Sequence, residues 1–231
     1  MTSSPPASAA HPVHHVSDEA LVEYASGSAS APAWLAMACH VSLCALCAGA
    51  ASALESVGGA LLATSPGEAL APTALDDTLA RLDAPPQARS EAAAVPEPPG
   101  FLIPFDLPPP LRRRLAETAP VADWRFVLPG IRAVELAAGP PGATVRLIAF
   151  KSGVTIPLHD HGGPEHIVVF SGALEEKGKR FARGDISVRV AGERHEQRVA
   201  AGEPCIALVV NEGKLQPLTL RGRLLIALSG G

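Results

Sequence analysis

The sequence predicts a multidomain α + β protein in which a small N-terminal helical unit precedes a small all-β barrel. Charge is the first observation behind this prediction: residues 1–80 hold seven acidic residues and no Lys or Arg, although the whole chain carries a net charge of only −4. Such an asymmetry indicates two units with different partners. The second observation is a change of pattern near Phe105, where helical runs give way to short β-rich runs between turn residues. The 47% apolar fraction is enough to bury a core, and 21 Gly and 23 Pro argue against one long helical bundle.

The helical unit is predicted over residues 14–83, after a small, polar, Pro-containing N-terminus (residues 1–13) that we expect to be disordered. Its first helix is predicted to start at Ser17, which is followed by two acidic residues, and to end at Gly27. Two further helices are predicted, over residues 32–62 and 73–82.

The stretch from Trp34 to Leu54 is long and apolar enough to be considered as a membrane span. However, no basic residue flanks it to orient it in a bilayer, and no basic region typical of a signal peptide precedes it. We therefore expect a cytoplasmic protein with no membrane partner, and a membrane-tethered sensor is the weaker alternative. Because cytoplasmic thiols stay reduced, clustered cysteines indicate metal binding or redox chemistry.

The β-rich unit is predicted over residues 105–231, after a Pro- and Ala-rich interdomain linker at residues 84–104. Its short apolar runs alternate with clusters of Gly, Pro, Asp or Asn, which is the spacing of an all-β sandwich or barrel. The predicted strands lie near residues 143–150, 155–161, 165–170, 186–190, 204–210 and 224–228.

The first candidate site lies in the helical unit. His40, Cys44 and Cys47 are spaced i, i+4 and i+7, positions that share one face of a helix. Two thiolates and an imidazole suit a tetrahedral Zn2+ site, and a structural site needs a fourth protein ligand. The candidates for this ligand lie near the start of the first helix: His11, His14 and His15. The alternative is that the two cysteines are small buried hydrophobic residues.

The second candidate site lies in the β-rich unit. His159 and His161 alternate along a predicted strand, so their side chains point to the same face. The Gly-Gly-Pro turn that follows can bring Glu165 back beside them, and His195 comes later in a Gly-x2-His sequence. Three imidazoles and one carboxylate form a site for a divalent metal, and these ligand types admit Zn2+, Mn2+, Fe2+ or Ni2+. The alternatives are a histidine pair in the core, or a barrel without a metal.

With the glycines around them, His159, His161, Glu165 and His195 resemble the two-part cupin signature, which implies a double-stranded β-helix (jelly-roll) barrel. The N-terminal segment resembles the zinc-binding anti-sigma domain of the ChrR family. In that family a His near the first helix joins a His-x3-Cys-x2-Cys sequence, so the resemblance selects His15 as the fourth ligand. The same family continues with a linker and a cupin-like domain that carries a His-His-Glu-His zinc site. The resemblance therefore covers nearly the whole chain, through two motifs in the right order.

The resemblance implies an anti-sigma factor, a transcription regulator whose N-terminal zinc domain binds and inhibits an extracytoplasmic-function-type sigma factor. It also implies that the metal-binding cupin domain mediates release under oxidative stress of the singlet-oxygen type. We expect no direct contact with nucleic acid, since the net charge is −4. The family has a Cys-x-Cys pair on a late strand, whereas this chain has Cys205 at the first position and Ala207 at the second. The thiol pair is therefore not available, and a lone Cys205 is more often a buried barrel residue than a redox switch.

A metal-dependent cupin enzyme, of the dioxygenase or decarboxylase type, is the alternative function. An enzyme needs an open coordination position and acid–base groups beside the metal. Glu175, Glu176 and Asp185 lie in turn-rich stretches, and we expect them to be solvated. We therefore expect no catalytic residues and no organic cofactor, and the separate zinc domain favours the regulator.

Overall fold

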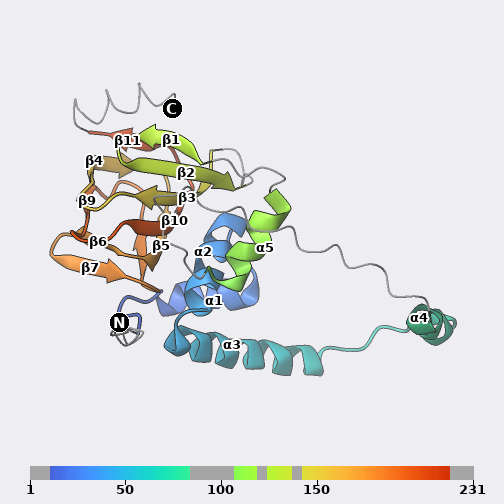
Figure 1. The fold of residues 1–231 in the computed structure, drawn as a ribbon. Helices are drawn as coiled ribbons and strands as arrows, with labels where there is room; N and C mark the ends of the chain where they lie inside the picture. Colours follow the sequence, from blue (N-terminus) through green and yellow to red (C-terminus); the bar gives the residue numbers. More distant parts are fainter. Residues whose placement is uncertain (1–10, 84–106, 119–123, 137–141, 219–231) are drawn as a thin grey trace, which may run out of the picture.

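The computed structural model describes residues 11–83, 107–118, 124–136 and 142–218 (Figure 1). The predicted linker at 84–104, the predicted strand at 224–228 and the first ten residues lie outside the described residues. The described helices are α1 (Asp18–Ser26), α2 (Ala31–Val41), α3 (Ala45–Thr64), α4 (Ala74–Asp83) and α5 (Pro109–Thr118).

Local sequence signals explain the ends of α1. The Ser17 side chain accepts a hydrogen bond from the backbone N–H of Ala20 at 3.3 Å, which satisfies one of the free donors of the first turn. At the other end Gly27 is left-handed, with φ of 72°, and its N–H bonds back to the carbonyl groups of the last turn. The prediction of this helix from Ser17 to Gly27 is confirmed.

The prediction of one helix over residues 32–62 is wrong, because the chain breaks between α2 and α3. The Ser42 hydroxyl donates to the carbonyl of Cys39 at 2.8 Å, and the N–H groups of Leu43 and Cys44 both donate to the carbonyl of His40. These local bonds end α2. Cys44 then adopts an extended conformation and becomes the N-cap of α3, which packs against α1.

The break also interrupts the apolar stretch between Trp34 and Leu54, so that this stretch is not one continuous helix. By length and composition alone, α3 is apolar enough to cross a membrane, and 11% of its apolar window is buried in the structure. In Figure 1, the C-terminal part of α3 and the whole of α4 extend away from the rest of the molecule, whereas the start of α3 packs against α1.

Helix α5 was not predicted, because prolines precede it and three consecutive arginines dominate its sequence. It is held by Leu111 and Leu115, which share one face at i and i+4 and are both buried. Through this face α5 packs against α2 and the second strand of the barrel.

The C-terminal unit consists of two antiparallel sheets. The six-stranded sheet has the order β1-β2-β3-β10-β5-β8, and the five-stranded sheet has the order β11-β4-β9-β6-β7. The strands are β1 (Arg125–Leu128), β2 (Ile131–Leu136), β3 (Thr144–Phe150), β4 (Thr155–His161), β5 (Glu165–Ser171), β6 (Ala173–Glu176), β7 (Lys179–Ala182), β8 (Ile186–Arg189), β9 (His195–Val199), β10 (Cys205–Asn211) and β11 (Leu215–Pro217). Five of the six predicted strands therefore coincide with β3, β4, β5, β8 and β10.

Strand β10 shows how the core is organised, because every one of its residues is buried. Cys205, Ala207 and Val209 point into a cluster between the two sheets, to which Phe150, Phe181 and other residues of both sheets contribute. The alternate residues of β10 point to the other face, where they join one cluster with α1, α2, α3 and α5. The helical unit and the barrel thus share a hydrophobic core, and a strand buried on both faces reads as a continuous apolar run.

Candidate metal centres

The structure brings together the four predicted ligands of the helical unit. The Nδ1 atom of His15 lies 3.3 Å from Sγ of Cys44 and 3.6 Å from Sγ of Cys47. The Nε2 atom of His40 lies 3.2 Å from Sγ of Cys47. All four ligand atoms lie within 4.8 Å of one another, and only His15 is exposed. These residues could hold one metal ion.

Three separate segments position this cluster, which we call the thiolate centre (His15, His40, Cys44 and Cys47). His15 precedes α1, His40 lies in the last turn of α2, and the cysteines begin α3. The break between α2 and α3 places both sulfur atoms at the N-terminus of a helix, where the helix dipole favours negative charge. The expectation that His40, Cys44 and Cys47 share one face of a continuous helix is therefore wrong, because they lie at the corner between α2 and α3.

Of the three histidines considered for the fourth position, the structure brings His15 to the cysteines. His14 points away from the cysteines: its ring packs at a tilt against Phe181, at a centroid distance of 4.3 Å, and its Nε2 lies 3.1 Å from the carbonyl oxygen of Arg180. His11 is exposed and belongs to neither candidate cluster in the described residues.

The protonation chemistry of the thiolate centre fits a bound cation. Burial, with the neighbouring Cys44 thiol, raises the pKa of Cys47 to about 11 when no metal is present. Burial also lowers the pKa of His40, so its imidazole is neutral. A metal requires the thiolate and the neutral imidazole, and it stabilises the thiolate that burial alone disfavours. Two sulfur and two nitrogen donors are the set that tetrahedral Zn2+ takes in structural sites.

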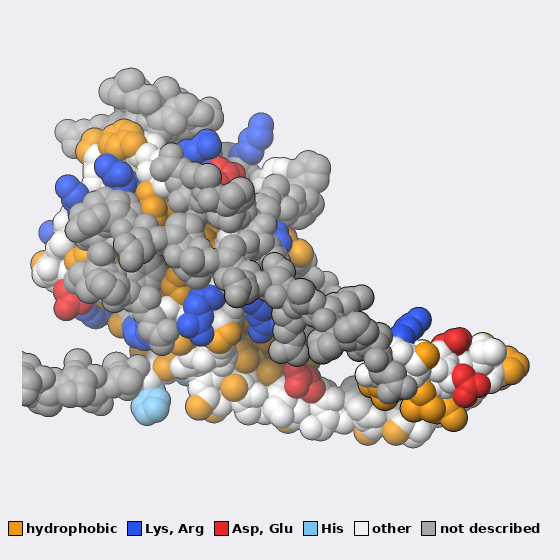
Figure 2. All heavy atoms as spheres, turned by 45° about the vertical axis from the view of Figure 1, so that its right-hand side comes forward, with side chains coloured by type: hydrophobic (Ala, Val, Ile, Leu, Met, Phe, Trp, Pro, Cys, Tyr) orange, Lys and Arg blue, Asp and Glu red, His pale blue; other side chains and the backbone are white. Residues whose placement is uncertain are grey.

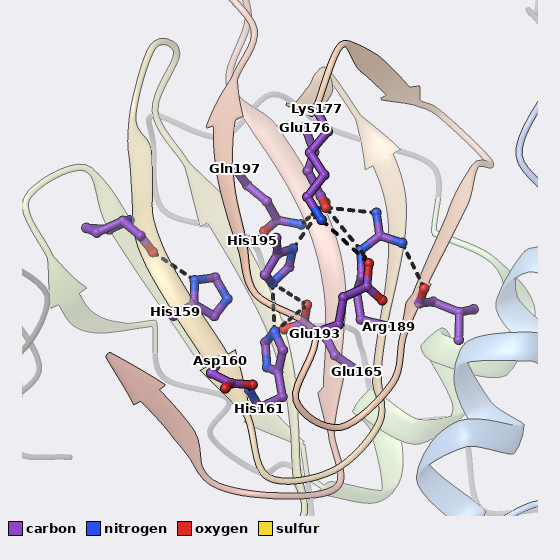
Figure 3. A network of polar contacts seen from close by, with 12 residues as sticks. His159, Asp160, His161, Glu165, Glu176, Lys177, Arg189, Glu193, His195 and Gln197 are labelled. Carbon is purple, nitrogen blue, oxygen red and sulfur yellow. Dashed lines mark hydrogen bonds and ion pairs between the residues drawn. The ribbon is translucent and has the colours of Figure 1, made fainter. Parts of the chain in front are cut away.

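The four predicted ligands of the barrel also converge (Figure 3). His159 and His161 come from β4, Glu165 begins β5 and His195 begins β9. The Nε2 atoms of His161 and His195 lie 2.7 Å apart, and Oε2 of Glu165 lies 3.6 Å and 3.3 Å from them. All four side chains are buried, and we call them the barrel centre (His159, His161, Glu165 and His195).

The barrel centre fits a divalent cation in its donor chemistry. The Nδ1 atom of His159 donates to the carbonyl of Pro157 at 2.8 Å, which leaves Nε2 unprotonated and available to a metal. Burial lowers the pKa of His159 to about 4 and raises the pKa of Glu165 to about 7. In the described part of the chain, Oε2 of Glu165 has no hydrogen-bond partner, although it is buried. A cation would satisfy this oxygen and return Glu165 to its ionised form.

A second layer of side chains surrounds His195, and the sequence analysis missed it. Oε2 of Glu176 lies 3.1 Å from Nδ1 of His195, and its other oxygen accepts from the guanidinium of Arg189 at 2.9 and 3.0 Å. Gln197 donates to Glu176 at 3.2 Å. Burial alone would raise the pKa of Glu176, but His195, Arg189 and Gln197 together lower it to about 2. This carboxylate orients His195, as outer partners of metal-bound histidines do.

The expectation that Glu176 and Asp185 are solvated is wrong, because both are buried. For Glu176 a signal existed: it alternates with Leu174, whose side chain lies in the interior of the barrel. Glu175 follows the expectation and is exposed. Cys205 is buried, and desolvation raises its pKa to about 12, in agreement with a barrel residue of low reactivity.

Comparison with known proteins shows similarity over both units. A family model described as "ChrR Cupin-like domain" matches residues 113–216. The anti-sigma-E factor ChrR of Cereibacter sphaeroides is 33% identical over 204 residues, which cover 88% of this chain and 91% of that protein. The ChrR-like chain in the crystal structure of Rhodobacter sphaeroides SigE in complex with the anti-sigma ChrR has a TM-score of 0.68 and 30% identity, over 86% of this chain and 98% of that one. These matches confirm the predicted fold, a helical unit followed by a cupin-type barrel.

Proposed function

This chain belongs to the ChrR family of anti-sigma factors, and from that premise we propose that it binds and inhibits an extracytoplasmic-function-type sigma factor. The observation that carries the proposal is the similarity in structure, over 86% of the chain, to an anti-sigma factor seen in complex with its sigma factor. A match of the barrel alone would support only the fold, since cupin barrels serve many functions.

Helices α3 and α4 are the surface that we propose for the sigma factor. They carry large apolar side chains that the rest of the chain leaves exposed, among them Val57, Leu61, Leu62 and Leu82. Figure 2 shows hydrophobic and acidic side chains along the projecting arm that these helices form in Figure 1. A contiguous exposed apolar surface is typical of an interaction site, and the acidic residues suit a partner with a basic rim.

We propose that the thiolate centre binds Zn2+ and that this ion stabilises the helical unit. The donor set fits structural zinc, and such an ion contributes folding free energy directly because the ligands come from separate segments. For the barrel centre we also propose Zn2+, although its donors admit Mn2+, Fe2+ or Ni2+. All four cysteines are free, which suits a reducing compartment, so we place the protein in the cytoplasm.

We propose that the barrel centre regulates release of the sigma factor under oxidative stress and does not catalyse a reaction. Glu176, an acidic side chain outside the ligand set that contacts His195, also pairs with Arg189 and Gln197 and has a pKa of about 2. It therefore makes a poor general acid or base at neutral pH. Imidazole side chains are oxidisable, and we propose oxidation at this centre as the signal. A cupin enzyme would need another acid–base group beside the metal.

The test of sigma binding compares two apolar-to-acidic substitutions in the full-length chain. Leu61→Glu places a charge on the proposed surface of α3, and Phe126→Glu places one at an equally exposed apolar position on the barrel (66% and 64% exposed). Each variant is co-expressed with the sigma factor, and co-purification and sigma-dependent transcription are measured. We expect Leu61→Glu to lose binding and inhibition and Phe126→Glu to keep both. Full inhibition by both variants would exclude α3 as the binding surface.

A further inference from the structure

The barrel contacts the thiolate centre directly, through the turn between β7 and β8 that we call the 183–185 turn (Arg183–Asp185). The Nδ1 atom of His40 lies 2.7 Å from the carbonyl oxygen of Gly184, and the contact is buried. Because a carbonyl only accepts, Nδ1 carries the proton and Nε2 keeps the lone pair that faces Cys47. A backbone group of the barrel thus fixes the tautomer in which His40 can bind a metal.

The same turn holds the segment that carries His15. One carboxylate oxygen of Asp185 accepts the backbone N–H groups of Val13 and His14, at 2.7 and 2.9 Å. The other oxygen accepts the N–H of Ala182, at 2.8 Å, within the turn. A carboxylate with several N–H donors forms strong charge-assisted bonds, and this one is only 2% exposed. His15 follows directly after the two residues that Asp185 holds.

A purely local role in the turn does not account for Asp185. The hydrogen bond to the N–H of Ala182 would be enough to stabilise the turn. The oxygen that accepts from Val13 and His14 makes no contribution within the turn and binds the N-terminal segment. The turn is also shaped to admit that segment: Gly184 has φ of +87°, and a Cβ atom there would lie 2.7 Å from Pro12. Two neighbouring residues of the turn therefore act on the two histidines of the thiolate centre: Gly184 contacts His40 directly, and Asp185 holds the backbone that leads into His15.

We propose that the 183–185 turn orients the two histidines of the thiolate centre, with Asp185 as a positioning residue that raises the metal affinity of this centre. The proposal rests on the thiolate centre as a metal site and does not depend on the sigma factor. It also gives the two centres a physical connection, since β8 runs from this turn to Arg189, which holds Glu176 against His195 (Figure 3). Only three strand residues, 186–188, separate Arg189 from the turn.

The test uses Asp185→Asn in the full-length chain, with Glu175→Gln as the matched control. The asparagine keeps the size of the side chain but sets an NH2 group against a backbone N–H donor in either orientation. Glu175 undergoes the same acid-to-amide change on β6, where it forms an exposed ion pair with Arg180. Metal-free protein is titrated with Co2+ against a competing chelator. The thiolate-to-cobalt charge-transfer absorption reports the thiolate centre alone, because the barrel centre contains no sulfur.

We expect Asp185→Asn to weaken Co2+ binding at the thiolate centre about 10-fold, because loss of a direct partner of a metal ligand costs about 10- to 100-fold and Asp185 acts through the backbone beside His15. The control should stay within about twofold of the wild type, since exposed ion pairs contribute little. Wild-type affinity in a folded Asp185→Asn variant would overturn the proposal. If the variant does not fold, ¹⁵N-histidine NMR of the wild-type protein decides. Protonation of His40 at Nδ1 supports the contact with Gly184, and protonation at Nε2 overturns it.

Discussion

Replacement of Arg189 by Met should destabilise the barrel by about 3 kcal/mol, because it leaves the carboxylate of Glu176 buried without its cation. The Glu176 side chain is 0% exposed and lies 2.9 Å from the guanidinium. Loss of one partner of a buried pair costs about 3–5 kcal/mol. The shift of the Glu176 pKa from 4.5 to about 2 corresponds to about 3 kcal/mol. His195 lowers this pKa more than Arg189 does, and Gln197 also contributes, so we expect the lower end of the range.

The matched control is Arg180→Met, on β7, the strand that precedes β8 in the chain. Arg180 pairs with Glu175 at 3.3 Å, but these side chains are 59% and 48% exposed. Exposed pairs contribute about 0.2–1 kcal/mol, so the control should lose less than about 1 kcal/mol. The free energy of unfolding of both variants is measured by urea titration at neutral pH with the metal content held equal. Equal losses in the two variants would refute the assignment of the buried pair.

The stability difference between the wild type and Arg189→Met should depend on pH. Because the pKa of Glu176 is lowered in the folded state, its stabilising effect is complete above the unfolded value of 4.5 and is lost as the pH falls toward 2. The difference in stability between the wild type and Arg189→Met should therefore shrink over this acidic range. A difference that stays constant down to pH 2 would mean that the substitution acts through packing of the Arg189 stem and not through the carboxylate.

Three further predictions concern the centres and the shared core. Cys47→Ser should lose both the metal of the thiolate centre, measured by elemental analysis, and sigma binding, because the ion stabilises the helical unit. Native affinity for the sigma factor in a zinc-free variant would contradict this prediction. His159→Ala and Glu165→Ala should still inhibit the sigma factor but no longer release it under singlet oxygen, measured as sigma-dependent transcription, and normal induction in both would move sensing to the thiolate centre. A fragment of residues 14–83 should bind a hydrophobic dye and unfold without cooperativity, because it lacks the barrel residues that complete the shared core. A cooperative unfolding transition would show that the helical unit folds alone.

The parts of the fold that the sequence predicted well are those determined by local signals. The ends of α1 follow from a capping serine and a left-handed glycine, both adjacent to the helix. Strands β5 and β10 are buried on both faces, and the apolar runs at residues 167–170 and 205–210 mark them in the sequence. The ligands of both centres could be proposed from spacing and resemblance, because donor type and turn geometry constrain which residues can meet. The break between α2 and α3 was missed, since Ser42 and Leu43 are compatible with a helix and the break depends on where α3 packs.

Asp185 shows most clearly why local patterns could not complete the site. Between two short strands, Arg-Gly-Asp has the composition of an exposed turn, and within the barrel alone the carboxylate would be solvated. Its burial comes from Val13 and His14, which lie 172 and 171 positions earlier, partly in a segment expected to be disordered. That segment is ordered at this point because the carboxylate accepts hydrogen bonds from its N–H groups and because the His14 ring packs against Phe181. The turn orders the segment and the segment buries the turn, so the sequence pattern of either one alone does not predict the contact. A variant that frees the N-terminal segment should therefore also expose Asp185, which hydrogen exchange at the Ala182 amide would detect.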